Sequence, residues 1–422
     1  MKLVIIFFFI NLSSNFIEPI KANINTKNNL TFFLDFTTGQ KFEINGNPIN
    51  SFRLTLYKFL KEKSMDIYKN KIKYCICNAK KIDFNKSLFE NNIVQNCHVL
   101  CYIDDTNNIN NDDNKIAVGF RLYGQITKAG CDYNGKSKLN QDNILIYLNV
   151  GNIDGFNLFG VLDGHGVNGY LVSKFCKYYF TRKMNEFAEK CKLDNISNPN
   201  QIYDKLRSTD YRFLKDCFNN VDSEMSRENN FDCTLSGTTC NMVIQLNKFL
   251  ICLNIGDSRS ILIYDNDTNT NQGILPLSKD HTPDLPEEYD RIINSGGITG
   301  KYIYDNKNGN VEDHIRIFKP GQNLPGIYLS RVLGDLMAKD CGVISEPQIN
   351  VFKLNHNAKY LLIYSDGIWK YLKNEEIRDL GNKYYQKGDI GSFCSNLTRK
   401  AVYRWKQNGI IRDDISLVCI YF

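Results

Sequence analysis

A buried-strand pattern in this chain ends in a turn that is suited to binding a metal ion. An apolar run at 156–162, interrupted only by Asn157 and Gly160, is followed directly by Asp-Gly-His-Gly at 163–166. Carboxylate and carbonyl oxygens are the ligands that hard divalent cations prefer. Glycine lets the backbone come close to an ion, and histidine exchanges protons near neutral pH. A single strand-ending Asp-Gly is usually only a turn, so the pattern gains weight only if it recurs.

The same pattern recurs along the chain. Apolar runs at 249–255 and 360–364 lead into aspartates, and the runs at 144–150 and 415–422 are preceded by them. The aspartates concerned are Asp142, Asp257, Asp366 and the pair Asp413-Asp414. Each alone fits a strand-terminating turn, but turns accept Asn, Ser or Gly as readily as Asp. Carboxylates gathered at strand ends repel one another unless cations neutralise them, so the set predicts a multi-aspartate metal centre.

From about residue 117 to residue 422 the sequence resembles the metal-dependent protein phosphatases of the protein phosphatase 2C (PPM) type. The matching motifs occur in family order, at 138–142, 163–166, 236–239, 254–259, 277–283, 291–297, 325–335, 365–369 and 413–414. The resemblance implies an α+β fold, a four-layer α/β/β/α sandwich in which a central antiparallel β-sandwich is flanked by helices. The metal centre would lie in a cleft at one end.

The resemblance implies a hydrolase that removes phosphate from phosphoserine and phosphothreonine in proteins, in signal transduction, with two Mg²⁺ or Mn²⁺ ions. Asp163 would bridge both ions, and Gly164 would give its backbone carbonyl to one of them. Asp366 and Asp413 would complete the shell of the other ion, and Asp142 would hold a metal-bound water. A water bridging ions ~3.5–4 Å apart ionises near neutral pH and would attack phosphorus in line.

The resemblance also assigns a general acid and a third-ion ligand. His165 would protonate the leaving serine or threonine oxygen; alternatively, it is a helix-start histidine satisfied by hydrogen bonding. Asp257, together with Asp366, would hold a weak third ion; alternatively, Asp257 braces Arg259.

Supporting roles follow for three further positions. Thr239 would hydrogen-bond near the metal waters, or it is an ordinary strand threonine. Asp335 is expected to be structural, fixing its own loop and Arg331. Where the family carries an arginine just before the acidic pair, this chain has Lys136 and Lys138. We assign phosphate binding to Lys138, acting as a point charge rather than as a bidentate clamp.

Two positions depart from the family pattern. Gln141 stands where a glutamate is frequent, a form that also occurs within the family. Lys370 stands where an Asp or Glu usually steadies water on the second ion. A positive charge there predicts that the second ion binds weakly and that activity needs high Mn²⁺ or Mg²⁺, unless Lys370 points to solvent.

The alternative function is a catalytically weak pseudophosphatase acting as a scaffold. A cyclase-like or kinase-like enzyme is less favoured, because no Gly-rich phosphate cradle is present.

Composition narrows the remaining choices. The net charge of +6 is spread along the chain without a basic stripe, which argues against nucleic-acid binding. We expect a monomer acting on phosphoprotein substrates. Of the 14 cysteines, several lie in apolar runs, as Cys252 and Cys419 do, and we expect them to be mostly reduced.

A helix is expected over 169–190, with its apolar residues Leu171, Val172, Phe175 and Tyr178 covering the sandwich. The polar insertions at 192–232 and 302–319 are expected to be loop-rich.

The segment before the phosphatase region has its own organisation. Residues 1–24 read as a secretory signal, which suggests entry into the secretory pathway or an organelle; the alternative is cytoplasm or nucleus. Residues 28–104 resemble a ubiquitin-like β-grasp domain, with strands at 30–36, 41–44, 71–77 and 97–103 and a helix over 50–63. An Asn/Asp-rich linker at 105–116 follows, with no Gly-Gly tail. Such a domain would bind a protein partner; alternatively, it is an extension packed on the catalytic region.

Overall fold

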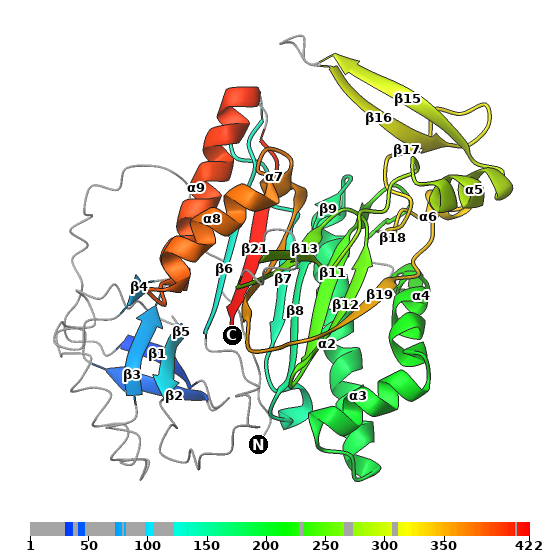
Figure 1. Cartoon of the computed structure of the whole chain (residues 1–422). Helices are drawn as coiled ribbons and strands as arrows, with labels where there is room; N and C mark the ends of the chain where they lie inside the picture. The colour runs from blue at the N-terminus through cyan, green and yellow to red at the C-terminus, as the bar shows by residue number, and fades with distance from the viewer. Residues whose placement is uncertain are drawn as a thin grey trace. The chain divides into compact units, whose positions relative to one another are not determined.

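The computed structural model describes residues 30–36, 41–46, 72–77, 80–81, 98–103, 122–132, 134–227, 231–265, 273–305, 311–409 and 412–422 (Figure 1). Within 30–103 and 302–313 it describes the backbone of the strands only. The chain divides into two units, residues 1–116 and 117–422, and each is described by itself.

Two antiparallel sheets form the centre of the larger unit. The first has the order β19-β12-β11-β8-β7 and the second β14-β13-β20-β21-β6. The strands of the first sheet are β7 (Asn143–Tyr147), β8 (Phe156–Leu162), β11 (Cys240–Leu246), β12 (Phe249–Ile255) and β19 (Gln348–Lys353). Those of the second are β6 (Leu122–Lys128), β13 (Arg259–Tyr264), β14 (Ile274–Pro276), β20 (Ala358–Tyr364) and β21 (Ile415–Tyr421). The sheets pack together through β8, β20 and β21, and every residue of β8 and β21 is buried.

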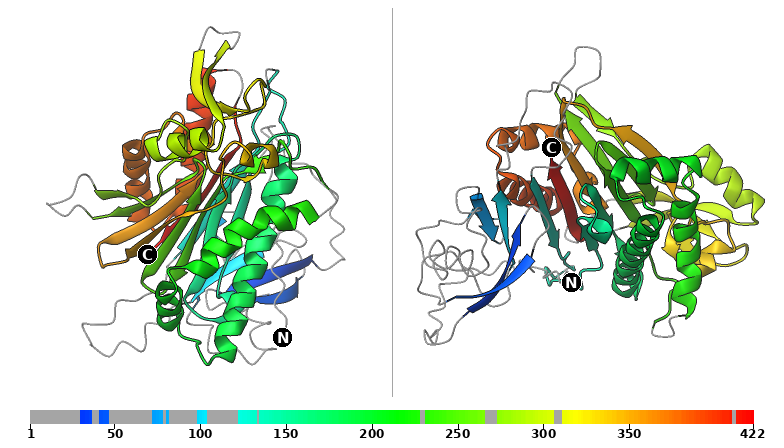
Figure 2. Two further views of the ribbon diagram at one scale, coloured as in Figure 1. Left: turned by 90° about the vertical axis from the view of Figure 1, so that its right-hand side faces the viewer. Right: turned by 90° about the horizontal axis from the view of Figure 1, so that it is seen from below.

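Helices cover both outer faces of this sandwich (Figures 1 and 2). Helices α2 (Gly169–Leu193), α3 (Pro199–Ser208) and α4 (Arg212–Arg227) lie over the first sheet. Helices α8 (Asn374–Tyr385) and α9 (Ile390–Asn408) lie over the second. Layered packing of this kind buries the apolar face of each element against the next, and it confirms the predicted α/β/β/α sandwich.

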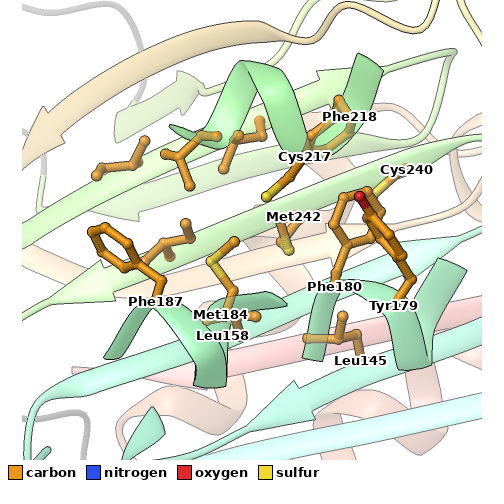
Figure 3. Packing of buried hydrophobic residues seen from close by; sticks show 14 of the residues in the cluster. Leu145, Leu158, Tyr179, Phe180, Met184, Phe187, Cys217, Phe218, Cys240 and Met242 are labelled. Carbon is orange, nitrogen blue, oxygen red and sulfur yellow. The ribbon is translucent and has the colours of Figure 1, made fainter. Parts of the chain in front are cut away.

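The side chains of α2 and α4 interlock over the first sheet (Figure 3). The rings of Phe180 and Phe218 lie 4.5 Å apart between their centroids, and both side chains are fully buried. Truncating a buried ring of this kind to alanine costs about 3–5 kcal/mol. The helix predicted over 169–190 is present as α2, but the expected buried face was partly wrong. Val172 is buried, whereas Leu171 and Tyr178 are 38% and 61% exposed.

The two insertions expected to be loop-rich are mostly regular. Residues 192–232 contain α3 and α4; Asn198 caps α3 by accepting a hydrogen bond from the Asn200 N–H, and Pro199 follows at the first helical position. Residues 302–319 belong largely to the hairpin of β15 (Ile298–Asp305) and β16 (Val311–Phe318), which β17 (Pro325–Ile327) joins. The shorter elements are η3 (Val150–Asn152), β9 (Gly164–His165), β10 (Gly237–Thr238), α5 (Pro286–Asn294), β18 (Leu333–Gly334), α6 (Leu336–Lys339) and α7 (Asp366–Trp369).

The smaller unit contains a mixed five-stranded sheet. Its strands are β1 (Leu30–Phe36), β2 (Lys41–Gly46), β3 (Ile72–Cys77), β4 (Lys80–Lys81) and β5 (His98–Ile103), in the order β2-β1-β5-β3-β4. Strands β1 and β5 run parallel and the other pairs antiparallel. The expected signal (1–24), helix (50–63) and linker (105–116) lie outside the described residues, so the ubiquitin-like assignment stays a prediction.

Two observations concern the rest of the described chain. The ten cysteines of the larger unit are free thiols, and all except Cys131 are buried. Helices long and apolar enough to cross a membrane do not occur among the described residues.

Candidate active site

Backbone pairing gathers the strand-end aspartates at one end of the sandwich. In the first sheet Asn143 pairs with Leu162, so Asp142 and Asp163, each one residue further along, lie beside each other. In the same sheet β12 runs antiparallel to β11 and ends two residues before Asp257. In the second sheet Tyr364 pairs with Leu417, which places residues 366 and 413 at neighbouring strand ends. Five of the aspartates singled out by the sequence therefore converge.

The carboxylates are close enough to raise one another's pKa. Burial raises the pKa of Asp163 well above its ordinary value, and the charges of Asp142, Asp366, Asp413 and Asp257 raise it further. Burial, followed by Asp413 and Asp257, does the same to Asp366. Burial and nearby carboxylates raise the pKa of Asp142 to about 7. Such a cluster favours the binding of cations, which would relieve the repulsion.

Three buried carboxylate oxygens of this cluster lack a hydrogen-bond partner among the described residues. They are Asp142 Oδ1, Asp257 Oδ1 and Asp366 Oδ1. Buried polar atoms are normally satisfied, so three orphans in one place suit a bound ion. No three His, Cys, Asp or Glu side chains of the described part of the chain already stand in an arrangement that could hold an ion. The side chains would therefore have to turn toward a shared ion.

The turn that carries Asp163 is fixed by hydrogen bonds and by a glycine. The Asp163 N–H donates to Thr239 Oγ1 at 3.0 Å, and the Thr239 N–H donates to the Asp163 carbonyl at 2.9 Å. Thr239 is thus more than an ordinary strand threonine, because it anchors the central aspartate. A Cβ on Gly164 would lie only 2.5 Å from the Gly169 carbonyl and 2.6 Å from the Gln141 carbonyl. Only glycine fits at position 164.

The paired aspartates at 413 and 414 have different surroundings. Asp413 is partly exposed, and its Oδ1 lies 2.5 Å from Lys138 Nζ. Asp414 is buried and accepts hydrogen bonds from the backbone N–H groups of Gly130 at 2.6 Å and Gln141 at 2.9 Å. Although burial lowers the pKa of Lys138, Asp413 and Asp414 raise it above the ordinary value, so the ammonium stays charged. Asp414 therefore has a structural role, and Lys138 lies within the site.

His165 pairs with a residue from a distant part of the chain. Its Nε2 lies 2.5 Å from Oδ2 of Asp335, and Asp335 is almost fully buried. A small sheet, β18-β10-β9, brings the two together, and a Cβ on the intervening Gly237 would lie 2.2 Å from Asp335 Oδ2. The expectation that Asp335 fixes Arg331 was wrong, because the Arg331 guanidinium bonds to Glu288 instead. Although burial lowers the pKa of His165, Asp335 raises it above its ordinary value.

Asp257 does not brace Arg259, which was the alternative role expected for it. Arg259 forms a bidentate pair with Asp280, with Nε–Oδ1 and Nη2–Oδ2 distances of 3.0 and 2.7 Å. Its guanidinium also lies 3.8 Å from the centroid of the Trp369 ring. Asp257 instead accepts a hydrogen bond from the hydroxyl of Tyr328 at 3.1 Å. Burial and the charge of Asp280 raise the pKa of Asp257 to about 6.

Comparison with known proteins decides the family. The sequence model described as "Protein phosphatase 2C" matches residues 128–409. The chain belongs to the protein phosphatase 2C family. It is 30% identical over 297 residues to "Probable protein phosphatase 2C 72" of Arabidopsis thaliana, covering 69% of this chain and 84% of that protein. With "Probable protein phosphatase 2C 34" of the same plant it is 28% identical over 291 residues, covering 68% and 78%.

A solved structure supports the fold. The serine-threonine phosphatase 2C from Toxoplasma gondii superposes with a TM-score of 0.57 at 20% identity, covering 71% of this chain and 94% of that one. As a protein phosphatase 2C, the chain belongs to the protein serine/threonine phosphatases, whose substrates are phosphoproteins. The family is in general dependent on Mg²⁺ or Mn²⁺.

Lys370 and Tyr328 also adjoin the aspartate cluster. The positive charge of Lys370 lowers the pKa of Asp366, although burial and the other carboxylates outweigh it. The Lys370 ammonium also lies 5.4 Å from the centroid of the Trp405 ring. Tyr328 was missed by the sequence reasoning, although it lies inside a matched motif region. The available signal was a hydroxyl-bearing aromatic residue two positions before the Ser-Arg pair at 330–331.

Proposed function

We propose that this chain is an active, divalent-metal-dependent phosphatase for phosphoserine and phosphothreonine in proteins. The observation that carries the proposal is the convergence of Asp142, Asp163, Asp257, Asp366 and Asp413, with three buried carboxylate oxygens lacking partners. A structural role alone gives no reason to gather so much negative charge at buried positions. A site that takes up divalent cations does.

The donor set fits two hard divalent ions. We assign Asp163 to a position shared by both ions and the Gly164 carbonyl to the first ion. Asp366 and Asp413 are assigned to the second ion, and Asp142 to a supporting position. When bound, Mg²⁺ or Mn²⁺ would neutralise the charge of the phosphate and activate the attacking water. Ser365 Oγ donates to Asp142 Oδ2 at 3.1 Å and so fixes that carboxylate toward the cluster. Asp257 with Asp366 is assigned to a weaker third ion.

We assign His165 the role of protonating the leaving group. The alkoxide of serine or threonine needs a proton as it departs, and a positioned imidazolium can deliver it. Asp335 raises the pKa of the imidazole and fixes its Nε2, which leaves Nδ1 to face another partner. The pair is thus a general acid and the residue that positions it.

Lys138 is assigned to the phosphate. Its ammonium lies beside Asp413, close to where a substrate phosphate would meet the second ion. A lysine can turn from a carboxylate to a phosphate because its charge is compact and its stem flexible.

A second candidate function is a pseudophosphatase that binds phosphoproteins without hydrolysing them. Two observations favour this function: the positive charge of Lys370 acts on Asp366, and Lys138 already pairs with Asp413. Both interactions would weaken the binding of the second ion. The two functions differ in whether phosphate is released when Mn²⁺ is abundant.

The deciding experiment is an assay of phosphate release from a phosphothreonine peptide across a Mn²⁺ titration. We expect release that depends on Mn²⁺ and is abolished by Asp163→Asn. The matched control is Asp216→Asn on the exposed surface of α4, which should behave as the wild type. No release at any Mn²⁺ concentration, from a protein that still binds the peptide, would instead support the scaffold.

Residues 1–116 have a separate proposed role. The strand order found in residues 30–103 supports a ubiquitin-like domain that binds a protein partner. We also propose that the protein is a monomer, which light scattering of the full chain would test. Fusing residues 1–30 to a fluorescent reporter would test the proposed secretory signal against the cytoplasmic or nuclear alternative.

A further inference from the structure

Tyr328 reaches into the carboxylate cluster from a separate part of the fold. It directly follows β17, the third strand of the hairpin sheet β15-β16-β17 (Figure 1). Its hydroxyl donates a hydrogen bond to Oδ2 of Asp257 at 3.1 Å. None of the roles assigned above uses this contact.

The contact decides how Asp257 is oriented. Asp257 is only 3% exposed, and its Oδ1 has no hydrogen-bond partner among the described residues. Arg259, the nearest cation in sequence, is occupied by Asp280. The carboxylate therefore has one oxygen held by a phenol and one oxygen left for an ion. An outer partner that holds one oxygen of a carboxylate in this way fixes its rotamer and raises its affinity for a metal.

The phenol is itself held by the hairpin sheet. The ring of His314 on β16 stacks on the Tyr328 ring, with centroids 5.4 Å apart and an interplanar angle of 27°. The guanidinium carbon of Arg316 lies 5.8 Å from the same centroid, and Arg316 Nη1 donates to the Gly326 carbonyl at 2.6 Å. His314 and Arg316 both lie on β16, so the Tyr328 ring packs against that one strand and its hydroxyl reaches Asp257 from a fixed platform.

We propose that Tyr328 is a positioning residue that orients Asp257 and thereby sets the affinity of the divalent-cation site shared by Asp257 and Asp366. The proposal rests on the proposed function in one respect, that Asp257 belongs to a cation site. It adds a residue from outside the aspartate cluster, and it ties the weakest ion to the β15-β16-β17 sheet. Loss of the contact between that sheet and Asp257 would therefore weaken the binding of this ion.

The test is Mn²⁺ titration calorimetry on the metal-stripped full chain. We expect Tyr328→Phe to weaken the lowest-affinity class of sites about tenfold and to leave the tighter sites unchanged. Tyr289→Phe, on exposed α5, is the matched control and should match the wild type. In an Asp257→Asn background, which should already have lost the weak site, Tyr328→Phe should have no further effect. A residue that served only packing would lower the melting temperature of the metal-free protein without selecting one class of sites.

The outcomes separate this inference from the proposed function. If the wild type binds Mn²⁺ and Asp257→Asn weakens it but Tyr328→Phe does not, the positioning role is overturned and the proposed function stands. If the wild type binds no Mn²⁺, both are overturned. Should Tyr328→Phe fail to fold, His314→Leu keeps the phenol but removes its stacking partner. That variant should weaken the same class of sites by a smaller factor, and an unchanged affinity would contradict the proposal.

Discussion

Nε2 of His165 lies 2.5 Å from Oδ2 of Asp335, although the two residues are 170 positions apart in the sequence. The buried carboxylate raises the pKa of the imidazole and fixes which nitrogen faces the protein. The contact depends on Gly237, because any side chain there would meet both residues. This relationship gives the general-acid assignment a geometry that can be tested.

Asp335→Asn should impair hydrolysis selectively. Loss of the negative charge lowers the pKa of His165, so the pH at which kcat declines on the alkaline side should move downward. We expect release from a phosphothreonine peptide to fall about 100-fold. Hydrolysis of p-nitrophenyl phosphate should fall much less, because its leaving group departs without a proton. Equal losses on both substrates, with an unshifted pH profile, would argue against a general acid. Asp340→Asn, at an exposed position, is the control.

Lys138→Met should change two constants in opposite directions. Loss of the phosphate contact should raise KM for the phosphopeptide about tenfold, as expected for one charged hydrogen bond. Release of Asp413 from its ion pair should lower the half-saturating Mn²⁺ concentration. Kinetics at several Mn²⁺ concentrations give both values. Lys136→Met, at the exposed neighbouring lysine, should change neither, and the assignment fails if Lys138→Met also leaves both unchanged.

Lys370→Asp should strengthen the binding of the second ion. The positive charge of Lys370 acts on Asp366, and replacing it with a carboxylate removes a repulsion and adds a group that can hold water on the ion. We expect the half-saturating Mn²⁺ concentration to fall several-fold in the phosphopeptide assay. The same charge reversal at exposed Lys383 in α8 is the control. An unchanged metal dependence would show that Lys370 does not weaken the site.

Glu288→Gln should destabilise the larger unit in a pH-dependent way. Glu288 is buried, and its oxygens bond to Arg291 Nη2 at 2.6 Å and to Arg331 Nε at 2.9 Å. Despite burial, which raises it, these bonds hold the pKa of Glu288 well below 4.5. The glutamate therefore contributes its full stability above about pH 4.5 and loses it as pH falls through the folded-state pKa.

At pH 7 the variant should lose about 3 kcal/mol of unfolding free energy, since removing one partner leaves buried charge uncompensated. Urea denaturation from pH 7 down to pH 3 should show the gap between wild type and variant shrinking below pH 4.5. A gap that stays constant or widens on acidification would contradict the ionised state of Glu288.

Much of the fold and the gathering of the aspartates could be predicted because their signals are local. Apolar runs such as 156–162 and 415–422 mark buried strands, and the aspartates beside them mark strand ends. The insertions were mispredicted because a polar surface masks the amphipathic stripe of α4, whose buried side includes Phe218 and Val221.

The side-chain partners could not be predicted, because they depend on how distant loops meet. Asp280 lies 21 positions from Arg259, and nothing local marks it as a better partner than Asp257. Tyr328, which directly follows β17, meets Asp257 across 71 positions of the sequence. The role of Lys138 in phosphate binding stays a prediction; its pairing with Asp413, 275 positions away, depends on the register of β21 against β6.

We propose that these aspartates share divalent ions, and anomalous diffraction from crystals grown with Mn²⁺ would locate those ions. We expect two strong Mn²⁺ peaks bridged by the Asp163 carboxylate, with Asp366 and Asp413 both bound to the second ion. Peaks elsewhere, or no peak at ligand distance from Asp163 in a well-ordered map, would contradict it.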